Sequence, residues 1–423
     1  MKYKIKIAIS CIMTLGLTVT LLWQSTNLLE RKESDVKNSS FFAQEEDFDV
    51  LFLGTSHMGY GIYPMELWND YGIVSYNLGG HGNPLATTYW TMENAFDYTT
   101  PKLVVIDCYL LSCMVKTNSS VSSVHLSFDA FPISKNKTAA TWDLLDDTEA
   151  ESMAELREPR SRMEVIWDYV IYHDRWNDLR EDDFAIELSI EKGAEHYAAV
   201  VPVEEIARIP AGSKMEEDTV SVQYLEKMIK DCNNREIDVL LTYFPFAADE
   251  ICQKEANKVY DIAEQYGVDY INFLDLDVVN YKTDFCDTDY HLNPSGARKV
   301  TDYTGRYIME HYDIPDQRNN AAYGNWYSDY EEYVKYKEDN LRSLESLDKY
   351  LMMLADKNYC AVIETGNTKF LDDEYYLNLL ENLQTDVTVK QDLNDDIRIS
   401  VFNKETMENV DQSCFAYHGR FSK

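Results

Sequence analysis

Two short segments, far apart in the sequence, contain side chains of the types that act together as a nucleophile and its base. Residues 54–57 have the sequence GTSH and directly follow an apolar run, and residues 287–296 have the sequence DTDYHLNPSG. A serine hydroxyl is a weak nucleophile on its own, and a histidine within hydrogen-bond reach supplies the missing base. The sequence therefore predicts a catalytic pair, with Ser56 as the nucleophile and His291 as the general base.

The acidic residues of the second segment offer a third member for this pair. A carboxylate on the far imidazole nitrogen fixes the tautomer of the histidine and stabilises its charged form. Two positions fit, Asp289 two residues before His291 and Asp287 four residues before it, and the spacing leaves both open. The same acidic loop is also consistent with a site for a hard cation or with a solvated turn.

Both segments follow apolar runs that have the length of buried strands. Helix-length segments at 85–96 and 249–265 separate such runs, which predicts an α/β fold with a parallel sheet and helices on both faces. Because the carboxyl ends of parallel strands meet at one edge of the sheet, Ser56 and His291 are expected to lie close together there. The predicted strands are residues 50–53, 73–76, 103–106, 239–243 and 268–273.

A long segment between the third and fourth predicted strands exceeds what a crossover connection requires. Residues 112–215 are therefore expected to form an insertion, helical around residues 163–179. Within it, Arg175 and Trp176 are candidate contacts for an anionic sugar polymer. The alternative is a helix that packs its aromatic face against the domain.

The catalytic domain is expected to span residues 47–315, and a second unit follows it. Residues 326–423 contain a charged helical stretch and then the pattern of a small α/β unit, which we interpret as an accessory domain. The eight cysteines show no Cys-x-x-Cys pair and no zinc spacing. One disulfide between Cys360 and Cys414 is compatible with the sequence, and most of the other cysteines are expected to be core thiols.

The N-terminal segment has the pattern of a membrane helix. Three lysines precede residues 7–23, a run without any charged side chain, so residues 1–25 are predicted to be a single-pass anchor. The positive-inside rule places the lysines in the cytoplasm and the rest of the chain outside the cell membrane. A cleaved signal peptide is the rival interpretation. Residues 26–46 are polar and are expected to form a tether.

The charge of the chain limits its partners. Its 423 residues include 74 acidic and 39 basic side chains, which gives a formal charge of −35. Since the anchor contributes +3, the remainder carries −38. A nucleic-acid partner is excluded, because phosphate binding needs a basic face. An anionic glycan would be repelled at long range, which favours a neutral one.

These segments resemble the SGNH, or GDSL-like, hydrolase superfamily over residues 49–312, apart from the insertion. The nearest likeness is to membrane-anchored proteins of cell-surface polysaccharide acylation, such as the D-alanine transfer proteins and the alginate O-acetyltransferases. The resemblance implies a flavodoxin-like α/β/α sandwich with a five-stranded parallel sheet. It also implies an oxyanion hole built by the Ser56 N–H and Gly79 or, less well, Gly82.

Two departures from the family pattern affect the expected site. Thr288 stands where the family has the aspartate of Asp-x-x-His, and the family's Gly-x-Asn-Asp block after the third strand is replaced at residues 105–109 by VIDCY. Asn83 is a candidate for the missing oxyanion donor, and loss of such a donor lowers rates about 10²-fold or more. His57 is expected to contact the substrate from beside the nucleophile.

The sequence thus predicts an extracytoplasmic serine esterase or acyltransferase that acts on acyl esters of cell-envelope polysaccharide. This chemistry requires neither a metal ion nor a cofactor. The resemblance implies a polytopic membrane acyltransferase as a partner where the acyl group is transferred rather than hydrolysed. The alternative is a non-catalytic surface protein that keeps the fold to bind glycan or to support envelope assembly.

Overall fold

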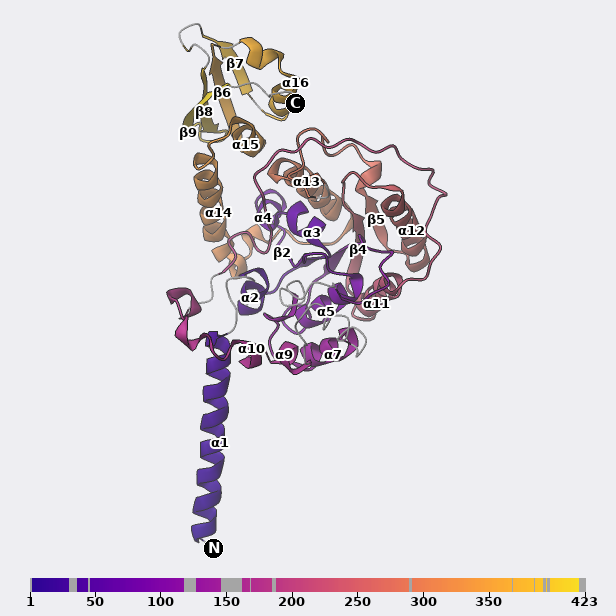
Figure 1. Ribbon diagram of the computed structural model, residues 1–423, viewed down its shortest axis with the longest axis vertical. Coiled ribbons are helices and arrows are strands. Elements are labelled where there is room, and N and C mark those ends of the chain that lie inside the picture. The colour runs from indigo at the N-terminus through magenta and orange to yellow at the C-terminus, as the bar shows by residue number, and fades with distance from the viewer. Residues whose placement is uncertain are drawn as a thin grey trace.

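The computed structural model consists of an apolar N-terminal helix, an α/β domain and a small C-terminal unit (Figure 1). It describes residues 2–29, 36–44, 46–117, 127–145, 162–167, 169–184, 188–288, 291–366, 368–383, 385–390, 393 and 396–417. The N-terminal helix and the C-terminal unit lie at opposite ends of the molecule.

Five parallel strands form the sheet of the α/β domain, in the order β2-β1-β3-β4-β5. Their side chains are almost all buried, as expected for a sheet covered on both faces. The predicted α/β class and the parallel five-stranded sheet are thereby confirmed. The strands are β1 (Val50–Leu53), β2 (Ser75–Asn77), β3 (Leu103–Asp107), β4 (Asp238–Tyr243) and β5 (Asp269–Asn272).

Helices cover both faces of this sheet (Figure 1). On one face α4 (Pro64–Tyr71) packs against α13 (Pro294–His311), and on the other α5 (Leu85–Ala95) packs against α11 (Val220–Asn234). Helix α12 (Glu250–Tyr266) packs against β4 and β5. Short 3-10 turns occur at η3 (Phe273–Asp275), η4 (Gln317–Asn319), η5 (Ala321–Tyr323) and η6 (Thr368–Asp372).

The described part of the insertion consists of short helices, three of which lie in the stretch around residues 163–179 where helix was predicted. The pieces are α7 (Lys135–Leu144), α9 (Arg162–Ile166), α10 (Tyr169–Tyr172), η1 (Arg175–Asn177) and η2 (Glu181–Phe184).

The N-terminal helix α1 (Lys2–Leu29) is long and apolar enough to cross a membrane, with a mean hydropathy of 2.0 and no burial over its apolar window. The prediction of a tether is wrong for α2 (Val36–Ala43), which packs on the domain. Phe41 is 2% exposed there, and its ring lies 5.6 Å from that of Phe48 and 5.1 Å from that of Tyr76. Aromatic burial therefore fixes this segment to the core.

The C-terminal unit has its own core and a four-stranded sheet of order β7-β6-β8-β9. Strand β6 pairs parallel with β7 and antiparallel with β8. Cys360 on β6 and Cys414 on β9 are free thiols, because β8 lies between the two strands. The elements are α14 (Asn325–Arg342), α15 (Leu347–Met353), β6 (Tyr359–Thr365), α16 (Glu374–Glu381), β7 (Thr385–Val389), β8 (Asp396–Asn403) and β9 (Asn409–Ala416).

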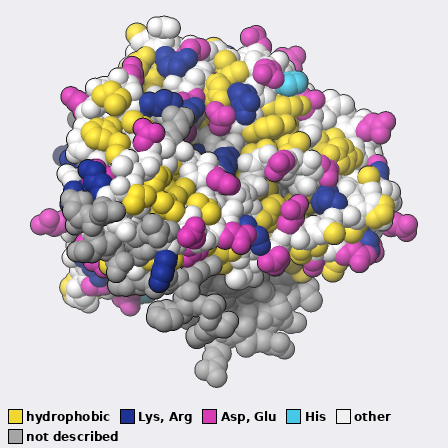
Figure 2. Space-filling view, turned by 90° about the horizontal axis from the view of Figure 1, so that it is seen from above, with side chains coloured by type: hydrophobic (Ala, Val, Ile, Leu, Met, Phe, Trp, Pro, Cys, Tyr) yellow, Lys and Arg dark blue, Asp and Glu magenta, His cyan; other side chains and the backbone are white. Residues whose placement is uncertain are grey.

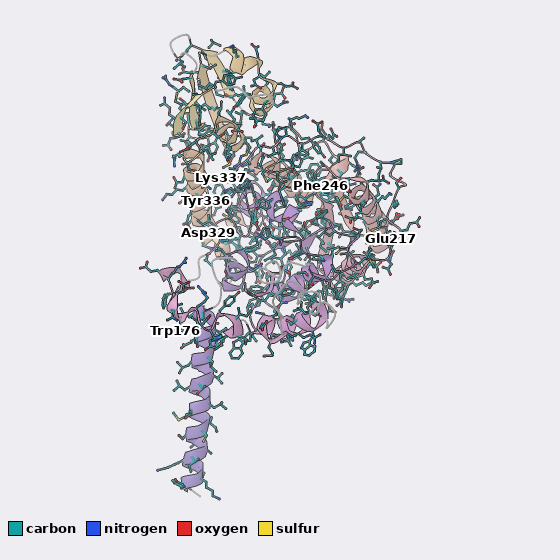
Figure 3. All side chains as sticks on the ribbon, viewed as in Figure 1. Trp176, Glu217, Phe246, Asp329, Tyr336 and Lys337 are labelled. Atoms are coloured by element: carbon teal, nitrogen blue, oxygen red, sulfur yellow. The ribbon has the colours of Figure 1, made fainter. Side chains whose placement is uncertain are left out.

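A buried group of charges joins the two units. The Lys337 ammonium on α14 lies 2.7 Å from a Glu66 oxygen on α4 and 2.9 Å from an Asp356 oxygen before β6. The Arg298 guanidinium on α13 lies 3.5 Å from Asp356 and donates to the Met353 and Ala355 carbonyls. We call Glu66, Arg298, Lys337 and Asp356 the junction cluster; Figure 3 labels Lys337 on α14.

Candidate active site

The turn after β1 presents Ser56 as the first residue of α3 (Ser56–Gly61). A Cβ at Gly54 would lie 2.5 Å from the Cβ of Asp107, so only glycine allows the ends of β1 and β3 to approach this closely. Thr55 caps α3: its hydroxyl accepts from the His57 N–H and donates to Asp107 Oδ2 at 2.8 Å. Ser56 therefore sits on a fixed turn at the carboxyl edge of the sheet.

This turn lies at the point in the sheet where successive strands change from one side of β1 to the other. Strand β1 is flanked by β2 on one side and β3 on the other, so the connections that follow β1 and β2 run in opposite directions. Crevices form at such switch points, outside the carboxyl ends of the strands. The position of Ser56 thus follows from the strand order.

Ser56, His291 and Asp287 form a continuous chain of hydrogen bonds, which we call the triad. His291 Nε2 lies 2.8 Å from Ser56 Oγ, and His291 Nδ1 lies 2.5 Å from Asp287 Oδ2. The His291 N–H also donates to Asp287 Oδ1 at 3.1 Å. Of the two candidate acids, Asp287 therefore meets His291, and Asp289 lies outside the described residues.

The loop that carries His291 is held by its own backbone and by Asn293. Phe285 and Leu292 form an antiparallel bridge, and the Asn293 amide donates to the Phe285 carbonyl at 3.2 Å. Asn293 Oδ1 also accepts from the Ser295 and Gly296 N–H groups, which caps α13. The Phe285–Leu292 bridge and the Asn293 cap thus fix the backbone beside His291 at the start of α13.

His57 lies behind the triad and is buried. Its ring stacks on that of Tyr109 at 4.3 Å and lies 4.9 Å from that of Phe246 and 6.0 Å from that of His291 (Figure 3 labels Phe246). Burial, together with the nearby His291, lowers the pKa of His57 to about 3, so this imidazole is neutral. With 3% exposure, His57 does not open to a substrate.

The candidate oxyanion donors differ in availability. The Gly79 N–H donates to Asn77 Oδ1 at 3.0 Å, and the Asn77 amide in turn donates to the carbonyls of Met58 in α3 and of Ile62, which caps its end. The Ser56 N–H has no acceptor in the part of the chain that the structure describes, so it remains a donor for an oxyanion.

The loop after Gly79 contains the other two candidate donors. Gly82 adopts a φ of +61° there, a left-handed conformation that suits glycine. Asn83 is 5% exposed, and its side-chain oxygen accepts from the Ser127 hydroxyl at 2.8 Å. This bond orients the Asn83 carboxamide, whose nitrogen lies against Gly80. Asn83 therefore anchors the loop to the insertion.

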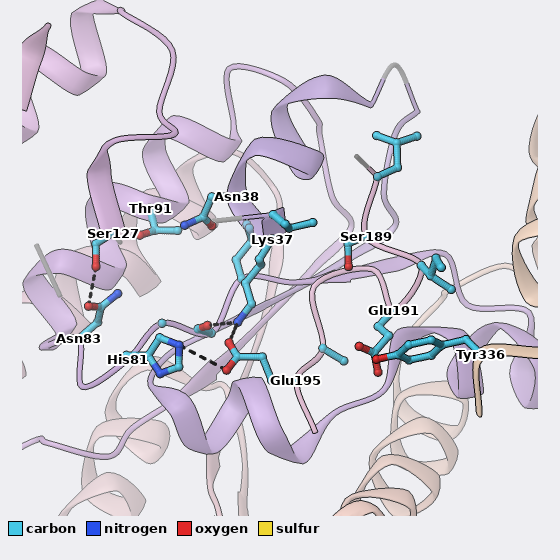
Figure 4. Close-up of a pocket in the computed structure, with 17 residues that line it drawn as sticks. Lys37, Asn38, His81, Asn83, Thr91, Ser127, Ser189, Glu191, Glu195 and Tyr336 are labelled. Carbon is cyan, nitrogen blue, oxygen red and sulfur yellow. Dashed lines mark hydrogen bonds and ion pairs between the residues drawn. The ribbon is translucent and has the colours of Figure 1, made fainter. Parts of the chain in front are cut away.

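A cavity of about 410 Å³ lies beside this loop (Figure 4). Lys37 donates to the Gly79 carbonyl at 2.6 Å and forms an ion pair with Glu195, whose other oxygen lies 3.3 Å from His81 Nε2. Burial raises the pKa of Glu195, but Lys37 and the nearby imidazoles of His81 and His291 together hold this pKa below its usual range. The other polar residues that line the cavity include Asn38, Asn83, Thr91, Ser127, Ser189, Glu191 and Tyr336.

The structure does not bring Arg175 and Trp176 to the triad. The Arg175 guanidinium donates to the Leu29 carbonyl at the end of α1 and to Asp183, at 2.9 and 3.0 Å. Trp176 is 66% exposed beside these contacts with α1, at the end of the domain from which α1 leaves (Figure 3). Neither residue supports the predicted role in binding substrate at Ser56.

Three residues at the site were not singled out from the sequence. Asp107 fixes Thr55, and burial raises its pKa to about 6 although hydrogen bonds from Thr55 and Tyr109 oppose this shift. Its position at the end of the strand beside β1 was a usable signal. Lys37 and Glu195 meet across 158 residues of chain, and no local pattern reveals such a pair.

Comparison with known proteins gives no relative for this chain: no protein-family model matches it, and no curated protein matches it significantly.

Proposed function

We propose that the protein is a serine esterase or O-acyltransferase that acts through an acyl-enzyme on Ser56. The observation that carries this proposal is the triad, in which a serine hydroxyl, both imidazole nitrogens and a carboxylate are connected in sequence. This is the arrangement that activates a serine toward an ester carbonyl. The triad is also partly open to solvent, with the His291 side chain 25% exposed.

In the proposed reaction, Ser56 Oγ attacks the carbonyl carbon of an acyl ester while His291 Nε2 takes the hydroxyl proton. The bond from Nδ1 to Asp287 holds the tautomer in which Nε2 is free to accept. The Ser56 N–H donates to the oxyanion. The protonated His291 then returns the proton to the leaving alcohol, which leaves the acyl group on Ser56. Water or a sugar hydroxyl, deprotonated by His291, takes the acyl group and restores the serine.

The fold agrees with the resemblance to the SGNH superfamily. The strand order 2-1-3-4-5 with helices on both faces is that of a flavodoxin-like sandwich, which supports assigning the chain to this group. The nucleophile follows the first strand, and the base precedes the last helix of the sandwich. Both positions match what the resemblance implies.

We further propose that α1 is an uncleaved anchor, with its lysines in the cytoplasm and the domains outside the cell. Burial of Thr26 and Leu29 against the insertion favours this over a cleaved signal peptide, because the end of the helix is part of the folded domain. A surface-bound enzyme suits esters of cell-envelope polysaccharide. A polytopic membrane acyltransferase is the partner that would supply acyl groups for transfer.

The cavity beside Gly79 is proposed to take the glycan. Its volume is within the range of small-ligand pockets, and its amides and hydroxyls suit sugar hydroxyls. Lys37 is already paired with Glu195, and Glu191 adds another negative charge. A neutral sugar therefore fits better than a phosphate or a uronate.

The test is covalent labelling of the full-length protein, in detergent micelles, with a serine-directed phosphonate. We expect one adduct, mapped by mass spectrometry to Ser56 and lost in Ser56→Ala but not in Ser328→Ala, a matched change of an exposed serine on α14. Turnover of an activated acetyl ester should follow the same pattern. If Ser56 neither labels nor supports turnover, the enzymatic proposal fails.

One observation favours the alternative of a non-catalytic glycan-binding protein. The Gly79 N–H already serves Asn77, which weakens the oxyanion hole that the resemblance implies. The alternative predicts that neutral oligosaccharides bind equally well to the wild type and to Ser56→Ala, and that envelope acylation in cells is unchanged by this substitution. Loss of envelope acylation in Ser56→Ala contradicts it.

A further inference from the structure

We propose that the insertion rests on the outer surface of the lipid bilayer and forms a second membrane contact beside α1. The contact surface, which we call the collar, consists of Val170, Trp176 and Phe184. The inference rests on the proposal that α1 crosses a membrane, and it goes beyond the chemistry of the triad. It assigns a partner to the part of the insertion that the active site does not use.

The end of α1 is held by a defined joint. The Trp167 indole donates to the Thr26 hydroxyl at 2.9 Å, and Arg175 donates to the Leu29 carbonyl at 2.9 Å. Arg175 is itself fixed by Asp183 at 3.0 Å, a side chain that is only 5% exposed. Thr26 and Leu29 are 4% and 5% exposed. The insertion is therefore attached rigidly to the helix just beyond its apolar run.

The height of this joint follows from helix geometry. The apolar run ends at Trp23, and Leu29 lies six residues further, or about 9 Å along the helix axis. The polar headgroup layer adds about 5–8 Å on each side of the hydrocarbon core. The elements bonded to Leu29 then lie near the outer boundary of the headgroup layer, within side-chain reach of the headgroup level at which tryptophan is enriched.

The collar exposes apolar side chains at this height. Trp176 adjoins Arg175 of the joint and is 66% exposed, and Phe184 adjoins Asp183 and is 70% exposed. Val170, on the α10 helix that contacts α1, is 40% exposed. Single exposed apolar residues need no explanation, but three around one helix end continue the apolar surface of α1 itself.

The two ends of the molecule differ in what they can contact. The face seen from above, away from α1, carries acidic and basic side chains interspersed among apolar ones (Figure 2). On the α1 side, α7, α9 and α10 lie at the end of the domain from which the helix leaves (Figure 1). Trp142 on α7 and Met163 on α9 are 59% and 54% exposed there. A domain with two membrane contacts has one orientation toward a surface-bound substrate.

The experiment is lipid photo-crosslinking of the full-length chain in phosphatidylcholine–phosphatidylglycerol nanodiscs. p-Benzoylphenylalanine replaces Trp176 or Phe184 in turn, with Leu17 in α1 as the positive control and exposed Glu405 in the C-terminal unit as the negative control. We expect lipid adducts, detected by mass spectrometry, at positions 17, 176 and 184 and none at 405.

Three results overturn the inference. Adducts at position 17 without adducts at 176 and 184 reject the collar and leave the anchor intact. In native membranes, adducts from 176 and 184 to a membrane protein in place of lipid assign this surface to a protein partner instead. Absence of adducts at 17 rejects the anchor and the collar together. Phosphonate labelling of Ser56 in the same samples reports the enzymatic proposal separately.

Discussion

The triad and the junction cluster are both networks of titratable side chains, and they differ in exposure and in charge balance. In the triad the side chains of His291 and Asp287 are 25% and 38% exposed. In the junction cluster the side chains of Lys337 and Asp356 are 6% and 1% exposed. One network meets solvent at the carboxyl edge of the sheet, and the other is sealed between two structural units.

The chemistry of the two networks differs as well. The junction cluster contains two cationic and two anionic side chains, so its charges compensate within the protein. It has no nucleophile, and its members come from α4, α13, α14 and the segment between α15 and β6. The triad instead places a neutral hydroxyl next to a base. Strong electrostatic coupling alone therefore does not identify a catalytic centre, and it is the order of hydroxyl, imidazole and carboxylate that makes the triad the candidate.

Removing the nucleophile or the base should give the largest effect. Ser56→Ala and His291→Ala are each expected to lower kcat for ester hydrolysis by about 10⁶-fold, and the double variant by little more, because the pair acts as a unit. Steady-state kinetics checks this, and chemical denaturation should show nearly unchanged stability. Additive losses in the double variant would mean that the two residues act independently.

The acid of the triad should come next. Asp287→Asn keeps the shape of the side chain but places a neutral amide against His291 Nδ1, so kcat is expected to fall by about 10⁴-fold. Asp289→Asn should leave kcat nearly unchanged. The same hydrolysis assay compares the two variants, and loss of activity in Asp289→Asn alone would assign the acid to the other position.

In the junction cluster, Lys337→Met should lower the free energy of unfolding and leave kcat unchanged. It leaves Glu66 and Asp356 buried without their ammonium partner, and breaking such a pair costs about 3–5 kcal/mol. Chemical denaturation measures the free energy of unfolding, while kcat of the folded enzyme should stay at the wild-type value. The matched control is Lys335→Met, an exposed position on the same helix, with a change below about 0.5 kcal/mol. A Lys337→Met enzyme of normal stability would contradict a structural role.

The junction cluster should also make stability sensitive to acid. Burial raises the pKa of Asp356, but Lys337 and Arg298 outweigh burial and hold it below its usual range. An acid with a lowered pKa in the folded state stabilises the fold above its ordinary pKa near about 4, and this contribution is lost as the pH falls below that value. The wild type should therefore lose stability relative to Asp356→Asn by up to about 1.4 kcal/mol per pH unit. Denaturation curves between pH 5 and pH 2 measure this difference, and parallel curves would show that Asp356 is not stabilised as an anion.

How far the sequence predicts this structure depends on the range of the contacts. The strands of the parallel sheet are apolar runs, so local patterns suffice to predict them. Ser56 directly follows β1, whereas His291 lies just before α13, well beyond the end of β5. The acid remained open because spacing does not determine side-chain direction in an irregular loop. The sequence analysis does not single out β7 and β9, whose residues are mostly exposed.

Contacts between distant segments account for the other differences. Arg175 is of a residue type that often binds anionic ligands, yet its guanidinium donates to the Leu29 carbonyl at the end of α1. Residues 36–43 are polar enough to suggest a tether, but Phe41 finds an aromatic pocket on the domain. In both cases the partner lies far away in the chain, and no local periodicity indicates it.

Lys37 offers the test with the smallest expected effect, because its exposure lies between that of the triad and that of the junction cluster. Its side chain is 14% exposed, and it donates to the Gly79 carbonyl beside the nucleophile while pairing with Glu195. A hydrogen bond from a charged group contributes about 1.5–3 kcal/mol, and partial exposure reduces this, so Lys37→Met should lower kcat/KM about tenfold. Lys102→Met, at an ion pair of 3.4 Å remote from the triad, is the matched control. If Lys37→Met lowers stability but leaves kcat/KM unchanged, Lys37 belongs with the junction cluster as a structural charge, and the cavity is separate from the active site.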